Sequence, residues 1–422
     1  MNYFEYKNDQ LFAEEVALAD LAKRVGTPFY VYSARTLRRH FRVFNEAFSG
    51  TDHLICYAMK ALSNLSILKL FASMGSGFDI VSAGELMRCM RVGADPRTIV
   101  FSGVGKTDEE IAAALEARIL MINAESRPEL HRIAEVAARM KRRAPVSLRV
   151  NPDLDPGTHP HISTGHRDSK FGVPLSQVAE YYAEARGLKD LELVGLSTHI
   201  GSQITDTGPF TEAAGKVRSI VTDLRASGVA LKYLDIGGGL GIPYQENPPP
   251  PSEYAAAMLG PIRGLGLKII SEPGRVMAGN AGVLVTRVLY MKETDVKRFV
   301  IIDAAMNDLI RPVLYEAYHA IVQVDRRNVG KLIVADVVGP VCESGDFLAR
   351  ERELPEPTAG DLLAVMSAGA YGFVMASNYN SRPRVPEILV NGAEAHVIRE
   401  RESFEDLIRG EKIVELKAHQ AD

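Results

Sequence analysis

Between residues 53 and 273, short β-like runs alternate with amphipathic helical stretches, and this alternation limits the possible folds more than any other feature. Alternating strands and helices are typical of parallel βα units. Eight strand candidates can be counted, at 53–60, 77–82, 98–103, 119–123, 145–151, 193–200, 233–238 and 267–273. An open doubly wound sheet produces the same local pattern, but eight units over about 220 residues favour a closed barrel. We therefore predict an α/β fold built on a (β/α)8 TIM barrel.

The pattern changes after residue 275 to short β-rich runs separated by proline and glycine, with one helix-like stretch near residues 309–318. This texture predicts an all-β second domain, and a length of 422 residues agrees with more than one domain. We expect a barrel over residues 30–275 and a β-sandwich or β-barrel domain over 276–422. Residues 1–29 belong to no barrel unit and are expected to pack on the β domain.

Composition excludes several other classes of protein. The net charge of −4 comes from interspersed acids and bases, which argues against nucleic acid as a partner. The N-terminus has no basic segment followed by an apolar core, and no later run is long enough to span a bilayer. The three cysteines, Cys56, Cys89 and Cys342, are widely separated and show no CxxC spacing. We expect a cytoplasmic protein with neither a disulfide framework nor a structural zinc.

Residues that could take part in catalysis or ligand binding follow several of the predicted barrel strands. In a TIM barrel the carboxyl ends of the strands form the active-site face. Lys60, Asp79, His199 and Glu272 lie at or near such ends, and glycines 237–239 follow the seventh strand. Each of these features also has an interpretation without a functional site, because a single lysine usually extends to water and a glycine run often forms only a turn. Their recurrence at one face of the barrel favours a common site.

The combination is that required for pyridoxal phosphate. A desolvated lysine has a lowered pKa and, as a neutral amine, can form an imine with a carbonyl. A glycine run offers backbone N–H groups to a phosphate. Glu272 could pair with a protonated ring nitrogen, and the His199 imidazole could stack on the face of the ring. Lys60 is therefore the candidate imine-forming residue.

A metal site is the competing hypothesis. His159, His161 and His166 cluster in the segment THPHISTGH after the fifth strand, and HxH pairs bind metals in some barrels. The pair lies about eight residues beyond its strand, and no matching carboxylate at a strand end accompanies it. We therefore expect no metal.

Five ordered motifs carry a resemblance to a known family. They are YAMKAL (57–62), HIGSQ (199–203), DIGGGLG (235–241), EPGR (272–275) and GPVCESGD (339–346). Their order and spacing resemble those of the alanine-racemase-fold, pyridoxal-phosphate-dependent decarboxylases. The resemblance extends from residue 27 to residue 390. Leu62 departs from it, since relatives often have a polar residue there, and we interpret this as a packing variation.

The resemblance implies a role for each matching residue. Lys60 would form the imine with pyridoxal phosphate, His199 would stack on its ring, and Glu272 would keep the ring nitrogen protonated. The resemblance also implies a phosphate site, with Tyr371 closing over it, made by Ser202, Gly238, Gly239, Gly274 and Arg275. The distal end of the substrate would be bound by Arg275, Arg311, Tyr315 and Tyr371, since guanidinium groups suit a carboxylate.

The family's pattern further implies a homodimer whose subunits share each active site. Cys342 would come from the partner subunit as the proton donor, and Glu343 would bind the distal ammonium of the substrate. Without the resemblance, Cys342 would be interpreted as an inert small residue. A monomer should therefore be inactive.

The residues after the cysteine bear on the choice of substrate. Relatives that act on ornithine tend to have an aspartate there, whereas this chain has Glu343 and Ser344. A glutamate together with Arg311 matches the amine and carboxylate at the far end of meso-diaminopimelate, which predicts a carboxy-lyase that makes L-lysine in the last step of lysine biosynthesis. Alternatives are a decarboxylase of ornithine, arginine or carboxynorspermidine, a non-catalytic pyridoxal-phosphate-binding protein, and a sugar-phosphate barrel enzyme.

Overall fold

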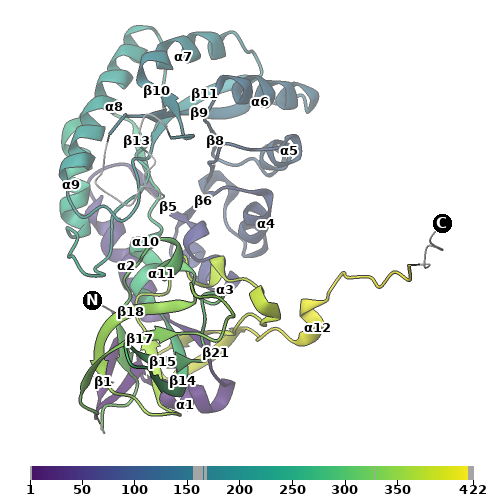
Figure 1. Cartoon of the computed structure of the whole chain (residues 1–422). Coiled ribbons are helices and arrows are strands. Elements are labelled where there is room, and N and C mark those ends of the chain that lie inside the picture. The colour runs from purple at the N-terminus through teal and green to yellow at the C-terminus, as the bar shows by residue number, and fades with distance from the viewer. Residues whose placement is uncertain (1, 155–164, 166–168, 328, 417–422) are drawn as a thin grey trace.

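Eight parallel strands close into a ring in the computed structural model, which describes residues 2–154, 165, 169–327 and 329–416 (Figure 1). Neighbouring strands of the ring pair in parallel, and the last pairs with the first. The strands are β5 (His53–Ala58), β6 (Gly77–Ile80), β7 (Ile99–Phe101), β8 (Met121–Ala124), β9 (Ala144–Asn151), β11 (Leu191–Thr198), β12 (Tyr233–Asp235) and β13 (Lys268–Ser271). The short strand β10 (Val173–Pro174) pairs with β9 outside the ring. The predicted TIM barrel is confirmed, with a strand in each of the eight predicted segments.

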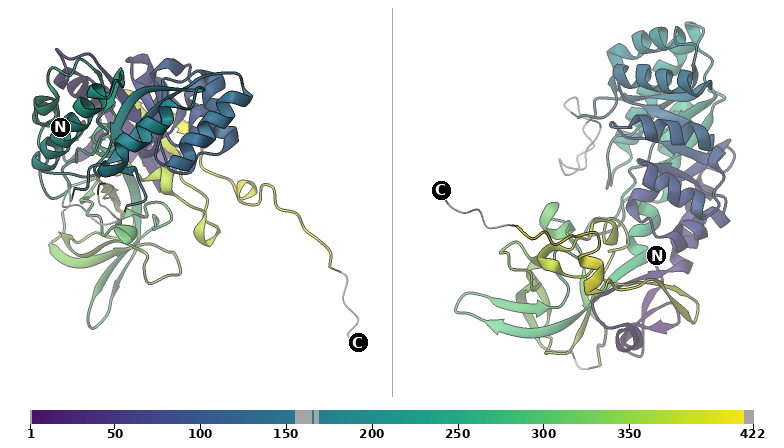
Figure 2. Two further views of the ribbon diagram at one scale, coloured as in Figure 1. Left: turned by 90° about the horizontal axis from the view of Figure 1, so that it is seen from above. Right: turned by 90° about the vertical axis from the view of Figure 1, so that its right-hand side faces the viewer.

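Helices surround the ring on its outer side (Figures 1 and 2). They are α2 (Ala34–Ala47), α3 (Leu65–Ser73), α4 (Ala83–Arg91), α5 (Asp108–Ala117), α6 (Arg127–Arg139), α7 (Val178–Arg186), α8 (Gly208–Ala226) and α9 (Pro251–Ile262). Several begin at a residue whose side chain accepts a backbone N–H, as Asn64 does for α3 and Ser126 for α6. Thr107 and Glu110 form a reciprocal capping box at the start of α5.

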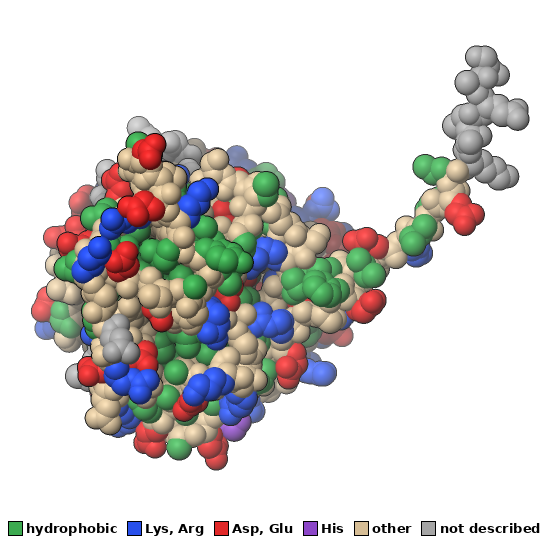
Figure 3. All heavy atoms as spheres, turned by 60° about the horizontal axis from the view of Figure 1, so that its bottom comes forward, with side chains coloured by type: hydrophobic (Ala, Val, Ile, Leu, Met, Phe, Trp, Pro, Cys, Tyr) green, Lys and Arg blue, Asp and Glu red, His purple; other side chains and the backbone are tan. Residues whose placement is uncertain are grey.

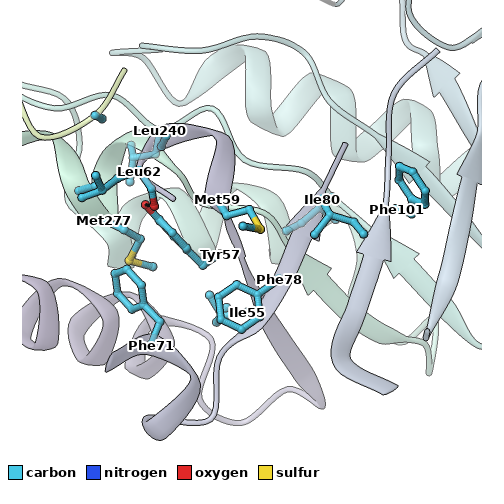
Figure 4. Close-up of a cluster of buried hydrophobic side chains, with 14 of the residues drawn as sticks. Ile55, Tyr57, Met59, Leu62, Phe71, Phe78, Ile80, Phe101, Leu240 and Met277 are labelled. Carbon is cyan, nitrogen blue, oxygen red and sulfur yellow. Dashed lines mark hydrogen bonds between the residues drawn. The ribbon is translucent and has the colours of Figure 1, made fainter. Parts of the chain in front are cut away.

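A buried apolar cluster fixes the turn that follows β5 (Figure 4). Tyr57 of β5 packs on Phe71 of α3 with ring centroids 4.3 Å apart. The Tyr57 hydroxyl donates to the carbonyl of Leu62 at 3.0 Å, and the Leu62 side chain is 1% exposed. Leu62 is therefore a core residue, as expected of a packing variation. The turn between Tyr57 and Leu62, which carries Lys60, is held at both ends.

The second domain is built on a mostly antiparallel sheet in the order β18-β17-β15-β14-β4-β20-β21, with β19 joining β14 to β16. The strands after the barrel are β14 (Gly282–Glu293), β15 (Arg298–Ile302), β16 (Ile321–Gln323), β17 (Leu332–Val338), β18 (Phe347–Pro355), β19 (Leu362–Val365), β20 (Glu387–Asn391) and β21 (Glu394–Arg399). The helix-like stretch near 309–318 is helical only in α11 (Arg311–Leu314). The C-terminal part of the chain is thus β-rich, as predicted.

The N-terminal segment joins this second sheet. Strand β4 (Phe29–Ser33) lies between β14 and β20, so the expected domain boundary at residue 30 falls inside a strand of the β domain. The strands β1 (Phe4–Lys7), β2 (Gln10–Ala13) and β3 (Val16–Ala17) form a small separate sheet next to α1 (Leu18–Val25). One apolar cluster unites Phe4, Leu11, Leu21, Val283 and Ile388. The first 33 residues therefore share the core of the C-terminal domain.

The chain leaves the folded body after the short helix α12 (Phe404–Leu407), as Figures 1 and 2 show. Apolar side chains are solvent-exposed in the segment after residue 407, where Ile413 is 99% and Leu416 is 88% exposed. Figure 3 shows acidic and basic side chains interspersed on the face of the body turned to the viewer. In the described part of the chain, no helix is long and apolar enough to cross a membrane.

Candidate active site

Lys60 occupies the turn at the carboxyl end of β5 and forms an ion pair. Its Nζ lies 2.9 Å from Oδ2 of Asp79, which β6 places on the adjacent strand. The Lys60 side chain is 39% exposed, whereas that of Asp79 is fully buried. Oδ1 of Asp79 is buried and has no hydrogen-bond partner. The strand end therefore holds a lysine that reaches solvent over a buried carboxylate.

The pKa of Lys60 departs from the sequence-based expectation. Burial lowers this pKa, but attraction by Asp79, with smaller contributions from Tyr371 and Glu272, raises it above the ordinary value of a lysine. The predicted lowered pKa is wrong for the unliganded protein. The sequence pattern showed an apolar strand before the lysine, but it did not show that the Asp79 carboxylate would meet the amine.

His199 follows β11 and is bound to the glycine loop. The backbone N–H of Gly238 donates to Nδ1 of His199 at 3.1 Å. Because Nδ1 accepts, this nitrogen carries no proton. Burial, with repulsion by Arg149 and Lys60, lowers the pKa of His199 well below its ordinary value. The imidazole is therefore neutral, and it is held in place by the loop that was expected to bind phosphate.

The glycines after β12 allow three loops to approach one another. A Cβ built on Gly238 would lie 2.3 Å from the carbonyl oxygen of Glu272, and one on Gly239 would lie 2.6 Å from that of Gly201. Gly239 also has a φ of +110°, which side-chain-bearing residues rarely adopt. Backbone atoms from the ends of β11, β12 and β13 thus meet at this loop. Such a narrow backbone cradle suits a phosphate.

Glu272, which is half-buried, and Asp235, which is buried, form an acid pair next to this loop. Asp235 accepts hydrogen bonds from the N–H of Gly237 at 2.9 Å and from the amide of Asn123 at 3.1 Å. Burial, then repulsion by Asp235, raises the pKa of Glu272 well above its ordinary value, and burial raises the pKa of Asp235 to about 6. The charged form of Glu272 is therefore disfavoured in the unliganded site. A cation placed beside it, such as a protonated ring nitrogen, would favour the carboxylate form and pair with it.

Arg275 joins the barrel to the C-terminal domain. Its Nη2 donates to the Ser202 hydroxyl at 3.0 Å, and its guanidinium lies 4.9 Å from the ring centroid of Tyr371. The backbone N–H of Tyr371 donates to the carbonyl of Ala61, the residue after Lys60, at 2.8 Å. Tyr371 has a φ of +56°, which is unusual for a residue with a side chain. The structure therefore brings Ser202, Arg275 and Tyr371 next to the lysine turn.

Arg275 and Arg311 meet at the hydroxyl of Tyr244. Nη1 of Arg311 donates to this hydroxyl at 2.8 Å, and Nη1 of Arg275 donates to it at 3.2 Å. Both arginines are buried, with 4% and 5% of their surface exposed. Two like charges in this position are costly unless an anion joins them, so the arrangement suits a carboxylate. Sequence reasoning missed Tyr244, although it is the single aromatic residue of the loop that follows the glycine run.

Three further predicted site residues make none of the contacts described above. Tyr315 is half-buried at the end of α11. Cys342 and Glu343 are exposed in the loop between β17 and β18, where the N–H of Cys342 donates to Asn380 at 2.9 Å. Of the metal candidates, His159, His161 and His166 lie outside the described residues. The described residues contain no group of three histidine, cysteine or acidic side chains that could hold a metal.

Comparisons with known proteins agree with this arrangement. Residues 34–279 match the family described as "Pyridoxal-dependent decarboxylase, pyridoxal binding domain". The diaminopimelate decarboxylase of Vibrio cholerae is 51% identical over 96% of this chain and 98% of its own length. That of Haemophilus influenzae is 49% identical, with the same shares of the two chains covered. The crystal structure of the Helicobacter pylori diaminopimelate decarboxylase complexed with L-lysine superposes with a TM-score of 0.90 at 45% identity, covering 93% of this chain and 98% of that chain.

Proposed function

Because the chain belongs to the family of pyridoxal-dependent decarboxylases, we propose that it decarboxylates meso-diaminopimelate to L-lysine, the last step of lysine biosynthesis. The observation that carries this choice of substrate is the meeting of Arg275 and Arg311 at Tyr244. Two buried guanidinium groups match a carboxylate at the far end of the substrate. Ornithine has no carboxylate there and would leave both charges uncompensated.

The site fits pyridoxal phosphate on three counts. The close backbone approach at the glycine loop leaves no space for a Cβ, the charge on Glu272 is disfavoured until a cation lies beside it, and Oδ1 of Asp79 is buried without a partner. When bound, the cofactor takes up the electron pair left behind by departing carbon dioxide. Lys60 would hold it through its amine, and the remaining contacts would come from His199, Ser202, Gly238, Gly239, Glu272, Gly274, Arg275 and Tyr371.

The residues around Lys60 determine the protonation state of its amine. The amine must lose a proton before it can react with a carbonyl. Oδ2 of Asp79, 2.9 Å away, stabilises the ammonium form, so this ion pair must separate before the amine can react. The neutral His199 imidazole can pack on an aromatic ring without adding a positive charge. Asp79 thus fixes the position and charge of the amine, and His199 leaves the face of a bound ring without an added charge.

We further propose that the active site is completed by a second copy of the chain. Cys342 of the partner would protonate the carbon that has lost carbon dioxide, and Glu343 would bind the distal ammonium while Arg311, Tyr315 and Tyr371 contact the distal end. Exposure of Cys342 and Glu343 on one loop supports this division of labour. A homodimer is the smallest assembly that would supply both halves.

Two finer proposals concern organisation and location. The functional units are a cofactor-binding barrel, expected over residues 30–275 but beginning after β4 in the structure, and a β domain over 276–422 that carries the N-terminal segment 1–29 together with β4. We also propose a cytoplasmic location, since the three cysteines are free and a reducing compartment keeps them so.

A substrate panel tests the proposed function. The protein with added pyridoxal phosphate is incubated with meso-diaminopimelate, ornithine, arginine and carboxynorspermidine, and carbon dioxide release is measured. We expect release from meso-diaminopimelate, with L-lysine as the product. Release from one of the other amino acids in its place would overturn the assignment. Bound cofactor without turnover of any of them would indicate a carrier protein.

A further inference from the structure

Nη1 of Arg311 makes two hydrogen bonds to side chains. It donates to the hydroxyl of Tyr244 at 2.8 Å and contacts Nε2 of His319 at 2.8 Å. An arginine Nη carries two hydrogens and cannot accept, so both of its hydrogens are used. His319 comes from the connection between α11 and β16, whereas Tyr244 comes from the loop after β12. Two separate parts of the chain therefore hold one nitrogen of one guanidinium.

The protonation of His319 follows from these contacts. Because Arg311 is the donor, Nε2 of His319 must accept, and the proton of the neutral ring sits on Nδ1. Nδ1 lies 2.8 Å from the carbonyl oxygen of Met366, to which it donates. His319 is fully buried, and burial together with the charge of Arg311 lowers its pKa to about 3. The neutral ring is thus a fixed acceptor for Arg311 at neutral pH.

The surroundings leave little freedom to this ring. The carbonyl of His319 accepts from Nη1 of Arg352 at 2.7 Å, and its ring lies edge-on to Tyr244 with centroids 5.4 Å apart. The contact with Met366, which follows β19, ties the ring to the β domain. The position of Nη1 of Arg311 is therefore set by the packing of both domains.

The opposite edge of the Arg311 guanidinium carries an unpaired donor. Nε of Arg311 is buried and has no hydrogen-bond partner. Nε and Nη2 form the side-on fork with which arginine binds both oxygens of a carboxylate. Leaving a buried donor of a charged group unpaired is costly, so this edge is suited to a ligand.

We propose that His319 and Tyr244 are positioning residues that clamp Nη1 of Arg311 and thereby direct its Nε–Nη2 edge to the distal carboxylate of the substrate. The inference rests on the proposed function and deepens it. His319 does not touch the substrate in this arrangement, and it acts only through Arg311. The hydroxyl of Tyr244 also accepts a hydrogen bond from Arg275, and it thereby keeps the guanidinium groups of Arg275 and Arg311 at a fixed separation.

Two replacements of His319 separate its contacts. The side-chain oxygen of glutamine can take the place of Nε2 and accept from Arg311, so His319→Gln preserves the clamp. The amide of asparagine reaches only as far as Nδ1, so His319→Asn keeps the bond to Met366 but loses the clamp. Tyr244→Phe removes the second acceptor and keeps the ring.

The test compares two ligands on the holoenzyme by calorimetric titration. The meso substrate has one D and one L centre. Because the product is L-lysine, the carboxylate that is lost comes from the D centre, and L-lysine keeps the distal carboxylate on the L centre. 1,5-Diaminopentane is L-lysine without that carboxylate. We expect His319→Asn to weaken L-lysine binding about tenfold, as loss of a hydrogen bond to a charged group does. Binding of 1,5-diaminopentane should not change, His319→Gln should stay within about threefold of the wild type, and Tyr244→Phe should weaken L-lysine alone.

The inference is overturned if His319→Asn binds L-lysine as the wild type does, if both His319 variants weaken it equally, or if both ligands are weakened alike. It is also overturned if the wild type itself does not distinguish the two ligands. If His319→Asn does not fold, Tyr244→Phe decides by the same comparison. Failure of the proposed function is seen separately, as absence of carbon dioxide release from meso-diaminopimelate by the wild type.

Discussion

The amine of Lys60 lies 2.9 Å from the carboxylate of Asp79, and this contact reverses the effect of burial on the lysine. Burial alone favours the neutral amine, which is the reactive form. The carboxylate favours the ammonium form and holds it at the strand end. The unliganded site therefore holds its nucleophile in the protonated form.

Replacing Asp79 tests this balance. In Asp79→Asn the attraction is lost and burial dominates, so the pKa of Lys60 falls. The rate at which the apoprotein takes up pyridoxal phosphate depends on the neutral amine, and its pH midpoint should move to lower pH. Stopped-flow absorbance of cofactor uptake measures the midpoint. Asp95→Asn, which alters an exposed pair with Arg97, is the control and should leave the midpoint in place. A midpoint unchanged or higher in Asp79→Asn contradicts the role given to this carboxylate.

Much of the fold could be predicted because each barrel strand is a short apolar run between turn residues. Strand β4 could not be assigned in this way. Its neighbours β14 and β20 lie some 250 and 350 residues further along the chain, and pairing over such separations leaves no local pattern. The expected boundary at residue 30 therefore cut through it.

Individual residues of the candidate site could be predicted from the sequence, but the contacts between their side chains could not. Lys60 and Glu272 could be found because they follow buried strands. The charge state of Lys60 depends on where Asp79 points, and the position of Arg311 depends on His319 and Tyr244, which other segments supply. The spacing of residues along the sequence does not predict the orientation of these side chains or the distances between them.

Glu272 should make the stability of the apoprotein depend on pH. Its pKa is raised in the folded state, so the folded protein binds more protons than the unfolded chain above pH of about 4.5. This contribution to stability is present at low pH and is lost as pH rises through the folded-state pKa. Glu272→Gln should abolish it, and the difference in unfolding free energy between pH 5 and pH 8 should change accordingly in urea titrations. Turnover of the holoenzyme should fall about a hundredfold or more. An unchanged pH dependence shows that Glu272 is not protonated in the folded protein.

A pair of glycine substitutions tests the backbone cradle. Gly238→Ala would place a methyl group 2.3 Å from the carbonyl oxygen of Glu272, and backbone cannot move aside cheaply. We expect a loss of about 1–3 kcal/mol in stability together with weaker cofactor binding. Gly215→Ala, in α8, meets no atom within 4 Å and should stabilise the protein by about 0.5–1 kcal/mol. Thermal unfolding and cofactor titration measure both variants. Equal effects of the two substitutions contradict the close approach at Gly238.

Mixing two inactive variants tests whether Lys60 and Cys342 of different subunits share one site. Lys60→Ala should lose turnover and the visible absorbance of the bound cofactor, and Cys342→Ala should lose turnover but keep the absorbance. In a hybrid dimer one site combines both substitutions and the other combines both native residues. Since half of a random mixture consists of hybrids, refolding the two variants together should restore about a quarter of the wild-type activity. If Lys60 and Cys342 of the same chain formed each site, every site would carry one substitution and no activity would return. Measuring activity against the mixing ratio, which should peak at equal amounts, separates the two arrangements.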